Sequence, residues 1–184
     1  KNISKINPES PESKTSQMGS LISGQHLKKV KRCVSKSLSE GGKLLYQGKI
    51  KKNLKGYFYP PTLIELSSTK NILFKEEVFG PVVAIIKFED EKEVVEMAND
   101  TNYGLAGGVW TQDISRALRV ASSIDAGYLW VNTYGGIIPE TPYGGFKQSG
   151  VGKELGSEGL EEYLRTKNIS IFTGSSLPSW YGKK

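Results

Sequence analysis

The stretch EEVFGP, residues 76–81, contains the residue types that most suggest chemistry. Two adjacent carboxylates, Glu76 and Glu77, precede Phe79, and a Gly-Pro pair then turns the chain into VVAIIKF, a largely apolar run of strand length. A carboxylate only accepts hydrogen bonds, and an aromatic face packs on flat apolar groups. Taken alone, these residues are equally those of a solvated loop with a core phenylalanine, so the pattern by itself assigns no ligand.

Two other side chains are candidates for a base or a nucleophile. His26 is the only histidine and lies in a basic segment, where a surface position is a simpler interpretation than a catalytic base. Cys33 is the only cysteine and lies in KRCVSK, where neighbouring cations can activate a thiol. Its place one residue from an apolar helical stripe favours a structural role. Neither residue has partners in a triad pattern, so the chain lacks an obvious nucleophile.

Nucleotide and metal motifs are absent from the sequence. GVGKELG, residues 150–156, has the first two glycines of a dinucleotide fingerprint, but its third glycine comes one residue too late and no strand directly precedes it. No GxxxxGK[ST] phosphate loop occurs either. A single cysteine excludes an internal disulfide and leaves no Cys/His cluster for a structural metal.

Composition and charge narrow the class of protein. The 184 residues can form one sizeable core or a large piece of a bigger protein, and because the first residue is Lys1 we expect a processed, tagged or partial chain. The net charge of +6 is concentrated in residues 26–32 and 49–55, which we interpret as a solvated helix face and a basic loop because no nucleic-acid motif accompanies them. With no membrane-length apolar run and no signal peptide, we expect a cytoplasmic protein without membrane or nucleic-acid partners.

The first half of the chain predicts one surface helix between irregular segments. Residues 1–17 have few apolar side chains and two prolines, which predicts an irregular lead-in. Ser23 is placed as an N-cap, and the helix is expected to end at the Gly pair 41–42. Its apolar stripe is Leu27, Val30, Val34 and Leu38. Two consecutive prolines make residues 56–66 extended.

A regular alternation begins at residue 82 and predicts an α/β fold. Strands are expected at 82–88, 107–111 and 128–134, with helices at 93–100 and 114–124 between them. Asp90 and Glu93 form a capping-box-like helix start. The second helix is expected to carry Ile114, Leu118, Ala121 and Ile124 on one face. Strands that alternate with helices predict right-handed βαβ units and a parallel sheet.

The last third of the chain predicts a long loop, a helix and a lone strand. Residues 135–150 lack a pattern of their own, which is typical of a functional or disordered loop. A helix is expected over 153–167, followed by NISIFTG, residues 168–174, as a short alternating strand. This strand has no sequential partner, so it needs a sheet edge from elsewhere, which suggests pairing across a subunit interface.

Several long motifs together resemble the C-terminal part of the NAD(P)-dependent aldehyde dehydrogenase superfamily, and its betaine aldehyde branch in particular. They are EEVFGPVVAIIKFEDEKEVVEMANDTNYGLAGGVWTQD, AGYLWVNTY, PYGGFKQSGVGKELGSEGLEEY and TKNIS, with MGSLISGQHLKKV and GYFYPPTL before them. They follow one another with family-like spacing over nearly the whole chain. The resemblance implies most of a catalytic domain in residues 1–167, and an oligomerisation strand and tail in 168–184.

The resemblance also implies roles for particular residues. Glu77 is similar to the glutamate that accepts hydrogen bonds from the ribose hydroxyls next to the nicotinamide, and Phe79 to the phenylalanine that packs beside that ring. Tyr143 falls where an aromatic side chain lines the aldehyde entrance, with core packing as the alternative. 

For the residues near the end of the long loop, the role implied by the resemblance and a purely structural role are equally supported. Glu154 matches a charge-relay position, and Lys147 and Gly150 match residues that offer backbone carbonyls to a potassium ion. Alternatively, Lys147 is a solvent-facing loop residue and Glu154 a carboxylate near a helix N-terminus.

The implied activity needs residues outside the motifs matched here. In the family, a cysteine thiolate attacks an aldehyde to give a thiohemiacetal, hydride passes to NAD or NADP, and a glutamate base activates the hydrolytic water. Both the nucleophile and the base are expected upstream, together with the Rossmann domain, so this chain alone is expected to be inactive. The implied partners are a small aldehyde and further copies in a dimer or tetramer. The alternative is a truncated, non-catalytic protein that joins enzyme assemblies through its last strand.

Overall fold

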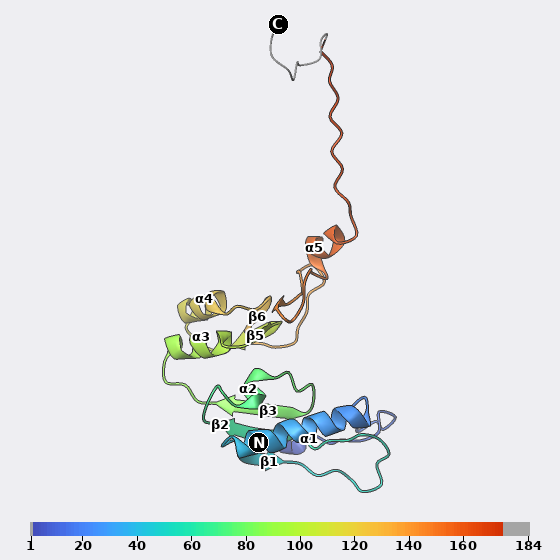
Figure 1. Cartoon of the computed structure of the whole chain (residues 1–184), viewed down its shortest axis with the longest axis vertical. Coiled ribbons are helices and arrows are strands. Elements are labelled where there is room, and N and C mark those ends of the chain that lie inside the picture. Colours follow the sequence, from blue (N-terminus) through green and yellow to red (C-terminus); the bar gives the residue numbers. More distant parts are fainter. Residues whose placement is uncertain (1, 175–184) are drawn as a thin grey trace.

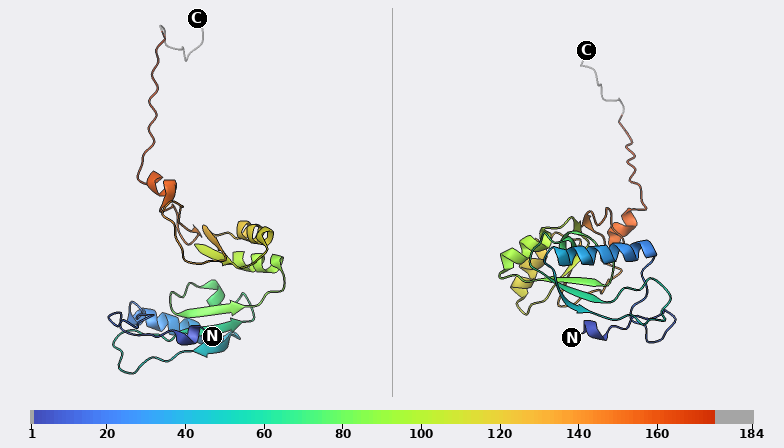
Figure 2. Two further views of the ribbon diagram at one scale, coloured as in Figure 1. Left: turned by 180° about the vertical axis from the view of Figure 1, so that it is seen from behind. Right: turned by 60° about the horizontal axis from the view of Figure 1, so that its bottom comes forward.

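The computed structural model describes residues 2–174. Its helices and strands form two groups, which are joined by residues 87–90 (Figure 1). The first group, called the first unit, contains α1 (Gly24–Ser39), β1 (Lys43–Gln47), β2 (Thr62–Leu66), α2 (Ile72–Lys75) and β3 (Val82–Ile86). The second unit contains α3 (Glu91–Asn99), β4 (Tyr103–Gly104), β5 (Ala106–Val109), α4 (Ile114–Ser123), β6 (Tyr128–Val131), β7 (Phe146–Lys147) and α5 (Gly156–Glu161). The two units are also distinct when the molecule is seen from behind (Figure 2).

Within the predicted lead-in, residues 2–17 contain one short 3-10 helix, η1 (Ile3–Lys5), and otherwise follow an irregular path. An isolated bridge pairs Pro8 with Met18. Glu9 accepts hydrogen bonds from the hydroxyls of Ser13 at 2.7 Å and Thr15 at 2.6 Å, and it also pairs with Lys51. The polar contacts of Glu9 therefore tie this segment to the loop after β1, and the neighbouring Pro8 is buried.

Helix α1 begins where its capping signal predicts. The Ser23 hydroxyl accepts a hydrogen bond from the backbone N–H of His26 at 3.1 Å. One face of the helix is buried, with side chains at the spacing i, i+3, i+4, i+7: Val30, Cys33, Val34 and Ser37. The predicted helix is confirmed. Val30 and Val34 of its predicted stripe are buried and Leu27 is partly buried, whereas Leu38 is 38% exposed.

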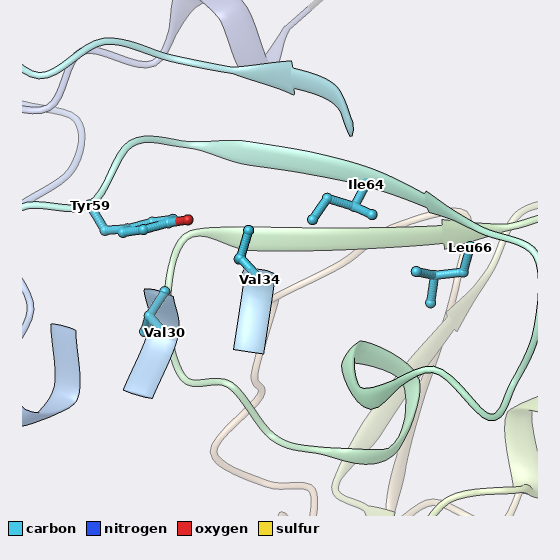
Figure 3. Close-up of a cluster of buried hydrophobic side chains, with 5 residues drawn as sticks. All are labelled: Val30, Val34, Tyr59, Ile64 and Leu66. Carbon is cyan, nitrogen blue, oxygen red and sulfur yellow. The ribbon is translucent and has the colours of Figure 1, made fainter. Parts of the chain in front are cut away.

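The core of the first unit lies between α1 and a three-stranded sheet in the order β1-β2-β3. β1 pairs antiparallel with β2, and β2 pairs parallel with β3 from Thr62↔Val82 to Leu66↔Ile86. The buried cluster consists of Val30, Val34, Tyr59, Ile64 and Leu66 (Figure 3). Val82, Ala84 and Ile86 pack against it, whereas Val83 and Ile85 on the opposite face of β3 are 51% and 42% exposed.

The second unit contains the βαβ crossover that the alternation predicts. β5 pairs parallel with β6, and α4 connects them and contacts both strands. The start of α3 is also confirmed, because Asp90 accepts from the backbone N–H of Glu93 at 2.9 Å and Glu93 accepts from the backbone N–H of Glu89 at 2.6 Å. The α/β class is therefore confirmed.

The strands do not form one continuous sheet among the described residues. They form three separate sheets, β1-β2-β3, β4-β7 and β5-β6. β3 pairs only with β2, and β5 pairs only with β6, so each keeps an unpaired edge in this part of the chain. The alternation predicts which segments are strands and their parallel sense, but adjacency depends on contacts that periodicity does not encode.

The helix predicted at 114–124 is confirmed as α4, but its predicted apolar face is only partly covered. Ile114 and Leu118 are 67% and 60% exposed and Ala121 and Ile124 are half-buried, whereas Ala117 and Val120 are buried. The face of α4 that packs toward β5 and β6 therefore contains Ala117 and Val120. Ile114 and Leu118, at i, i+4 spacing, lie on a face that is exposed.

The helix predicted over 153–167 is much shorter, because only Gly156–Glu161 forms α5. Leu155 and Gly156 both have positive φ, 63° and 59°, and glycine disfavours the helical interior, which explains the late start. Residues 164–173 contain no regular structure and are exposed. The predicted strand 168–174 is therefore extended but unpaired in the described chain, and the tail 175–184 lies outside the described residues. Within residues 2–174, no helix has the length and apolar character needed to cross a bilayer.

Candidate functional site

The EEVFGP segment is a turn in which Val78 faces the core and the residues on either side of it face solvent. Val78 packs against the core cluster of the first unit, while Glu77 and Phe79 on either side of it are exposed. The Phe79 side chain is 76% exposed, and its φ is 57°, in the left-handed region that disfavours residues with a Cβ. The alternative of a core phenylalanine is therefore wrong.

Two side chains of α1 hold this turn by its backbone. The His26 Nε2–H donates to the Phe79 carbonyl at 2.7 Å, and the Lys29 ammonium donates to the Glu77 carbonyl at 2.9 Å. His26 was expected to be an uninvolved surface residue, and its contact was missed because the two residues are 53 positions apart. The sole histidine thus belongs to the candidate site through a backbone contact.

The turn leads directly into the parallel sheet. The Pro81 carbonyl accepts from the Thr62 backbone N–H at 2.9 Å, so strand pairing begins at the end of the turn. A Cβ placed on Gly80 would lie 2.8 Å from the Val30 side chain, which leaves no room for a larger residue there. The turn is therefore fixed on one side by β2 and on the other by α1.

Cys33 lies on the buried face of α1 and is 1% exposed. Its thiol cannot be reached by a substrate in this structure, which agrees with the predicted structural role. No group of three or more His, Cys, Asp or Glu side chains in residues 2–174 is arranged to hold a metal ion.

An open cavity of about 990 Å³ joins the turn to the second unit. Glu76 and Glu77 line it from the first unit, and the length of β5 lines it from the second. Ser149 of the FKQSG motif also lines it, and the Ser149 hydroxyl accepts from the backbone N–H of Gly104 at 3.0 Å. The cavity therefore brings the predicted cofactor residue Glu77 and the FKQSG motif to one space.

An ion-pair network lies at the edge of this cavity. The Arg119 guanidinium donates two hydrogen bonds of 3.0 Å to the two oxygens of Glu91, and Arg116 lies 3.3 Å from the same carboxylate. The hydrogen bonds from Arg119 hold the pKa of Glu91 below its ordinary value. Glu91 is therefore an ionised structural partner that ties α3 to α4 rather than a candidate base.

Tyr143 and Glu154 are brought together by their backbones. The backbone N–H of Tyr143 donates to the Glu154 carbonyl at 2.6 Å, and the Glu154 N–H donates back at 2.7 Å. The Glu154 side chain is exposed just before α5, whose N-cap is Leu155. The Glu154 carboxylate thus lies close to the start of α5, and the backbone bridge holds Glu154 beside Tyr143, so its position is compatible with both roles considered for it.

Tyr143 belongs to a row of four aromatic rings that the sequence did not reveal as a group. Its ring centroid lies 5.7 Å from that of Tyr128, which lies 4.7 Å from Trp130, which in turn lies 4.9 Å from Tyr134. The Trp130 indole N–H donates to the Gly136 carbonyl at 2.7 Å and so ties the start of loop 135–149 to β6. Tyr143 is half-buried, and Tyr134 at the other end of the row is 70% exposed.

The Lys147 side chain is held by three oxygens rather than extended into solvent. Its ammonium donates to the carbonyls of Asn99 at 3.0 Å and Thr101 at 3.2 Å, and lies 3.1 Å from an Asp125 oxygen. The alternative of a solvent-facing lysine is therefore not what the structure shows. Gly150 lies three residues later, with φ 147°.

Left-handed backbone coincides with the candidate residues. In residues 2–174, the non-glycine residues with positive φ are Phe79, Asn132, Lys147 and Leu155. Two of them are predicted site residues, and Leu155 follows a third, Glu154. Such conformations cost free energy and persist only where the surroundings impose them.

Comparison with known proteins places these features in a family. The model of the aldehyde dehydrogenase family matches residues 1–169. Betaine aldehyde dehydrogenases from Bacillus subtilis and Hordeum vulgare are 41% identical over 168 residues and 42% identical over 166 residues, and each match covers 90% of this chain. The chain spans about a third of these relatives, 34% and 33% of their lengths.

Solved structures agree with the sequence relatives. Two structures of betaine aldehyde dehydrogenase from Staphylococcus aureus, a G234S mutant without cofactor and a complex with NAD⁺, each match 99% of this chain with a TM-score of 0.91 and 39% identity. Each match covers 37% of that protein. The family predicted from the motifs, including its betaine aldehyde branch, is confirmed. The chain belongs to the aldehyde dehydrogenase family.

Proposed function

We propose that this chain is the part of an NAD(P)-dependent aldehyde dehydrogenase that presents Glu77 and Phe79 to the nicotinamide end of the cofactor. The reaction is oxidation of an aldehyde to a carboxylic acid through a cysteine thiohemiacetal. The nucleophilic cysteine and the glutamate base belong to parts of the family fold outside the residues matched here, so the chain alone does not turn over. Residues 1–167 form part of the catalytic domain in this proposal.

The geometry of the EEVFGP turn carries the proposal. An acceptor-only carboxylate at Glu77 fits the two hydroxyl donors of a ribose, and a 76% exposed aromatic ring two residues later fits a flat pyridine ring. Val78 between them anchors the turn in the core, so both side chains leave the same rigid support. When bound, NAD or NADP supplies the acceptor for the hydride, while these residues orient its reactive end.

The substrate side of the proposal rests on loop 135–149 and the aromatic row. The relatives are named for betaine aldehyde, whose trimethylammonium group is a cation without hydrogen-bond donors. Aromatic faces attract such cations, and the row from Tyr143 to Tyr134 offers several of them beside the loop. We assign Tyr143 to the aldehyde entrance on this basis.

Two further assignments, a charge relay and a potassium site, depend on the proposed enzyme function. We assign Glu154 to a charge relay, because the backbone bridge to Tyr143 places it beside the proposed aldehyde entrance. We assign a potassium ion to the backbone carbonyls of Lys147 and Gly150, since the left-handed backbone at Lys147 turns successive carbonyls in different directions and potassium prefers oxygen ligands.

The first test uses the 184-residue chain itself. NADH formation is measured with several aldehydes at high protein concentration, with Cys33→Ser as the matched variant. We expect no activity from either protein because the only thiol is buried. Activity of the chain that disappears in Cys33→Ser would refute this part of the proposal.

The second test places the chain in a complete fold. In a chimaera, this chain replaces the matching segment of the Bacillus subtilis relative, and Glu77→Gln is compared with Glu76→Gln. We expect Glu77→Gln to slow hydride transfer because a neutral amide is a poorer acceptor for the ribose hydroxyls, and Glu76→Gln to have little effect. Equal turnover and equal cofactor affinity in both variants would show Glu77 to be an ordinary loop carboxylate.

One observation favours a second candidate function, that of a non-catalytic partner in enzyme assemblies. In the segment 168–174, Ile169, Ile171 and Phe172 are 74%, 80% and 52% exposed on an extended backbone. Such a segment can add as a strand to another subunit's sheet, and we propose that the same addition would join copies of the enzyme into a dimer or tetramer. Deletion of 168–184, or Ile171→Lys, should then lower the mass measured by light scattering, and an unchanged mass for both variants would exclude this role.

A further inference from the structure

The EEVFGP turn has a backbone conformation that its own residues do not favour. Phe79 has a φ of 57°, which brings its Cβ too close to the following carbonyl, and its ring is too exposed to be held there by burial. The turn therefore needs support from outside its own sequence if Glu77 and Phe79 are to keep one direction.

One face of α1 supplies three contacts to three successive parts of this turn. His26, Lys29 and Val30 follow the spacing i, i+3, i+4 and so lie on the same side of the helix. Lys29 binds the Glu77 carbonyl, His26 binds the Phe79 carbonyl, and Val30 packs where Gly80 lacks a side chain. Each contact is to the backbone, so it fixes the path of the turn and leaves the side chains of Glu77 and Phe79 free.

We propose that His26 and Lys29 are positioning residues that hold the turn so that Glu77 and Phe79 point outward together. This inference rests on the proposed function for its catalytic consequence, but the positioning itself is a property of this chain. His26 supplies the decisive contact, because its hydrogen bond is to the carbonyl of the left-handed residue. The ring must keep the proton on Nε2 to do so, since a carbonyl only accepts hydrogen bonds.

The bond predicts a particular pattern of rescue. His26→Leu removes the donor and keeps an apolar side chain, whereas His26→Gln keeps an N–H donor of comparable reach. If His26 only fills space, the two substitutions have similar effects; if it holds the Phe79 carbonyl, Gln restores what Leu loses. Lys28, exposed on the same helix, gives a matched control for its neighbour, because Lys28→Met and Lys29→Met are the same chemical change.

The first measurement is NMR of the isotopically labelled 184-residue chain. The carbonyl ¹³C shift of Phe79 reports the hydrogen bond, and the coupling between its amide and α protons reports φ. We expect His26→Leu to change both, His26→Gln to leave both near the original values, and Lys29→Met but not Lys28→Met to shift the Glu77 carbonyl. Unchanged signals in His26→Leu, or equal changes in the Leu and Gln variants, overturn the inference.

The second measurement uses the chimaera with the Bacillus subtilis relative. A displaced turn misplaces the nicotinamide end, so we expect His26→Leu to lower kcat about fivefold to tenfold, the factor that corresponds to one net hydrogen bond. The KM for NAD⁺ should change less than about twofold, and His26→Gln should recover most of kcat.

The two measurements separate failure of the inference from failure of the proposed function. If Glu77→Gln slows the chimaera and His26→Leu does not, the positioning role is wrong while the proposed function stands. If the chimaera is inactive or insensitive to Glu77→Gln, the proposed function fails, and the NMR signals of Phe79 alone decide whether α1 holds the turn.

Discussion

Phe79→Gly is expected to make the protein more stable than Phe79→Ala. Both substitutions remove a ring that is 76% exposed, so the two variants lose the same small amount of burial. They differ in backbone freedom, because alanine at a φ of 57° keeps the Cβ conflict and glycine removes it. The comparison therefore isolates the free energy stored in the left-handed backbone of the turn.

The magnitude follows from two opposing contributions. Relief of the left-handed conformation favours glycine by about 1–2 kcal/mol, and the greater freedom of glycine in the unfolded chain opposes this by about 0.5–1 kcal/mol. The net expectation lies between about 0 and 1.5 kcal/mol, with a central value of about 0.75 kcal/mol in favour of Phe79→Gly. With a urea dependence of about 2 kcal/mol per molar, the central value moves the unfolding midpoint by roughly 0.4 M.

The assay is urea unfolding followed by far-ultraviolet circular dichroism, with Glu76 as the control position. Glu76 is also exposed but has φ −107° and ψ 137°, an extended conformation that alanine adopts freely. There the order should reverse, with glycine less stable than alanine. If glycine is less stable than alanine at both positions, the turn stores no strain and the reasoning from backbone conformation is refuted.

The remaining predictions concern the lead-in, the loop after β6 and the contact between α3 and α4. Hydrogen bonds from Lys51, Thr15 and Ser13 lower the pKa of Glu9 to about 2. Its stabilising contribution is therefore present above the ordinary carboxyl value of 4.5 and is lost as the pH falls toward 2, and Glu9→Gln should remove this acid dependence from amide exchange in residues 1–17. Trp130→Phe keeps an aromatic ring but loses the bond to the Gly136 carbonyl, so hydrogen exchange in loop 135–149 should rise about fivefold to tenfold, and unchanged exchange would show that the bond does not hold the loop. Arg119→Gln should raise the pKa of Glu91 toward its ordinary value in an NMR titration; a pKa that stays low would assign the shift to Arg116.

Local signals in the sequence predicted the elements of the fold well. Ser23 and Asp90 cap the helices that they were expected to start, because a capping side chain acts on backbone groups two or three residues away. Apolar runs identified β3 and β6, and the alternation gave the parallel pairing of β5 with β6, whereas the parallel partner of β3 is β2, which precedes the alternation. Such information lies within a few residues, and a single sequence displays it directly.

Contacts between distant segments were the part that the sequence did not predict. The His26 bond to Phe79 joins residues 53 positions apart, and nothing in either local pattern indicates it. The aromatic row likewise combines β6 with a residue of the following loop. For the candidate site, the family resemblance supplied Glu77 and Phe79, whereas the residues that hold them required coordinates.

Two elements expose apolar faces that their sequence patterns would favour burying. β3 is apolar on both faces, as in strands covered on both sides, yet only Val82, Ala84 and Ile86 are covered by the core cluster, while Val83 and Ile85 are exposed. Ile114 and Leu118 on α4 are exposed in the same way. The relatives that this chain matches with a TM-score of 0.91 are nearly three times as long, so their fold includes many residues that have no counterpart here. The hydrophobic pattern of a segment reflects all of the surfaces that pack against it. For these faces of β3 and α4, no element within residues 2–174 covers the exposed apolar side chains.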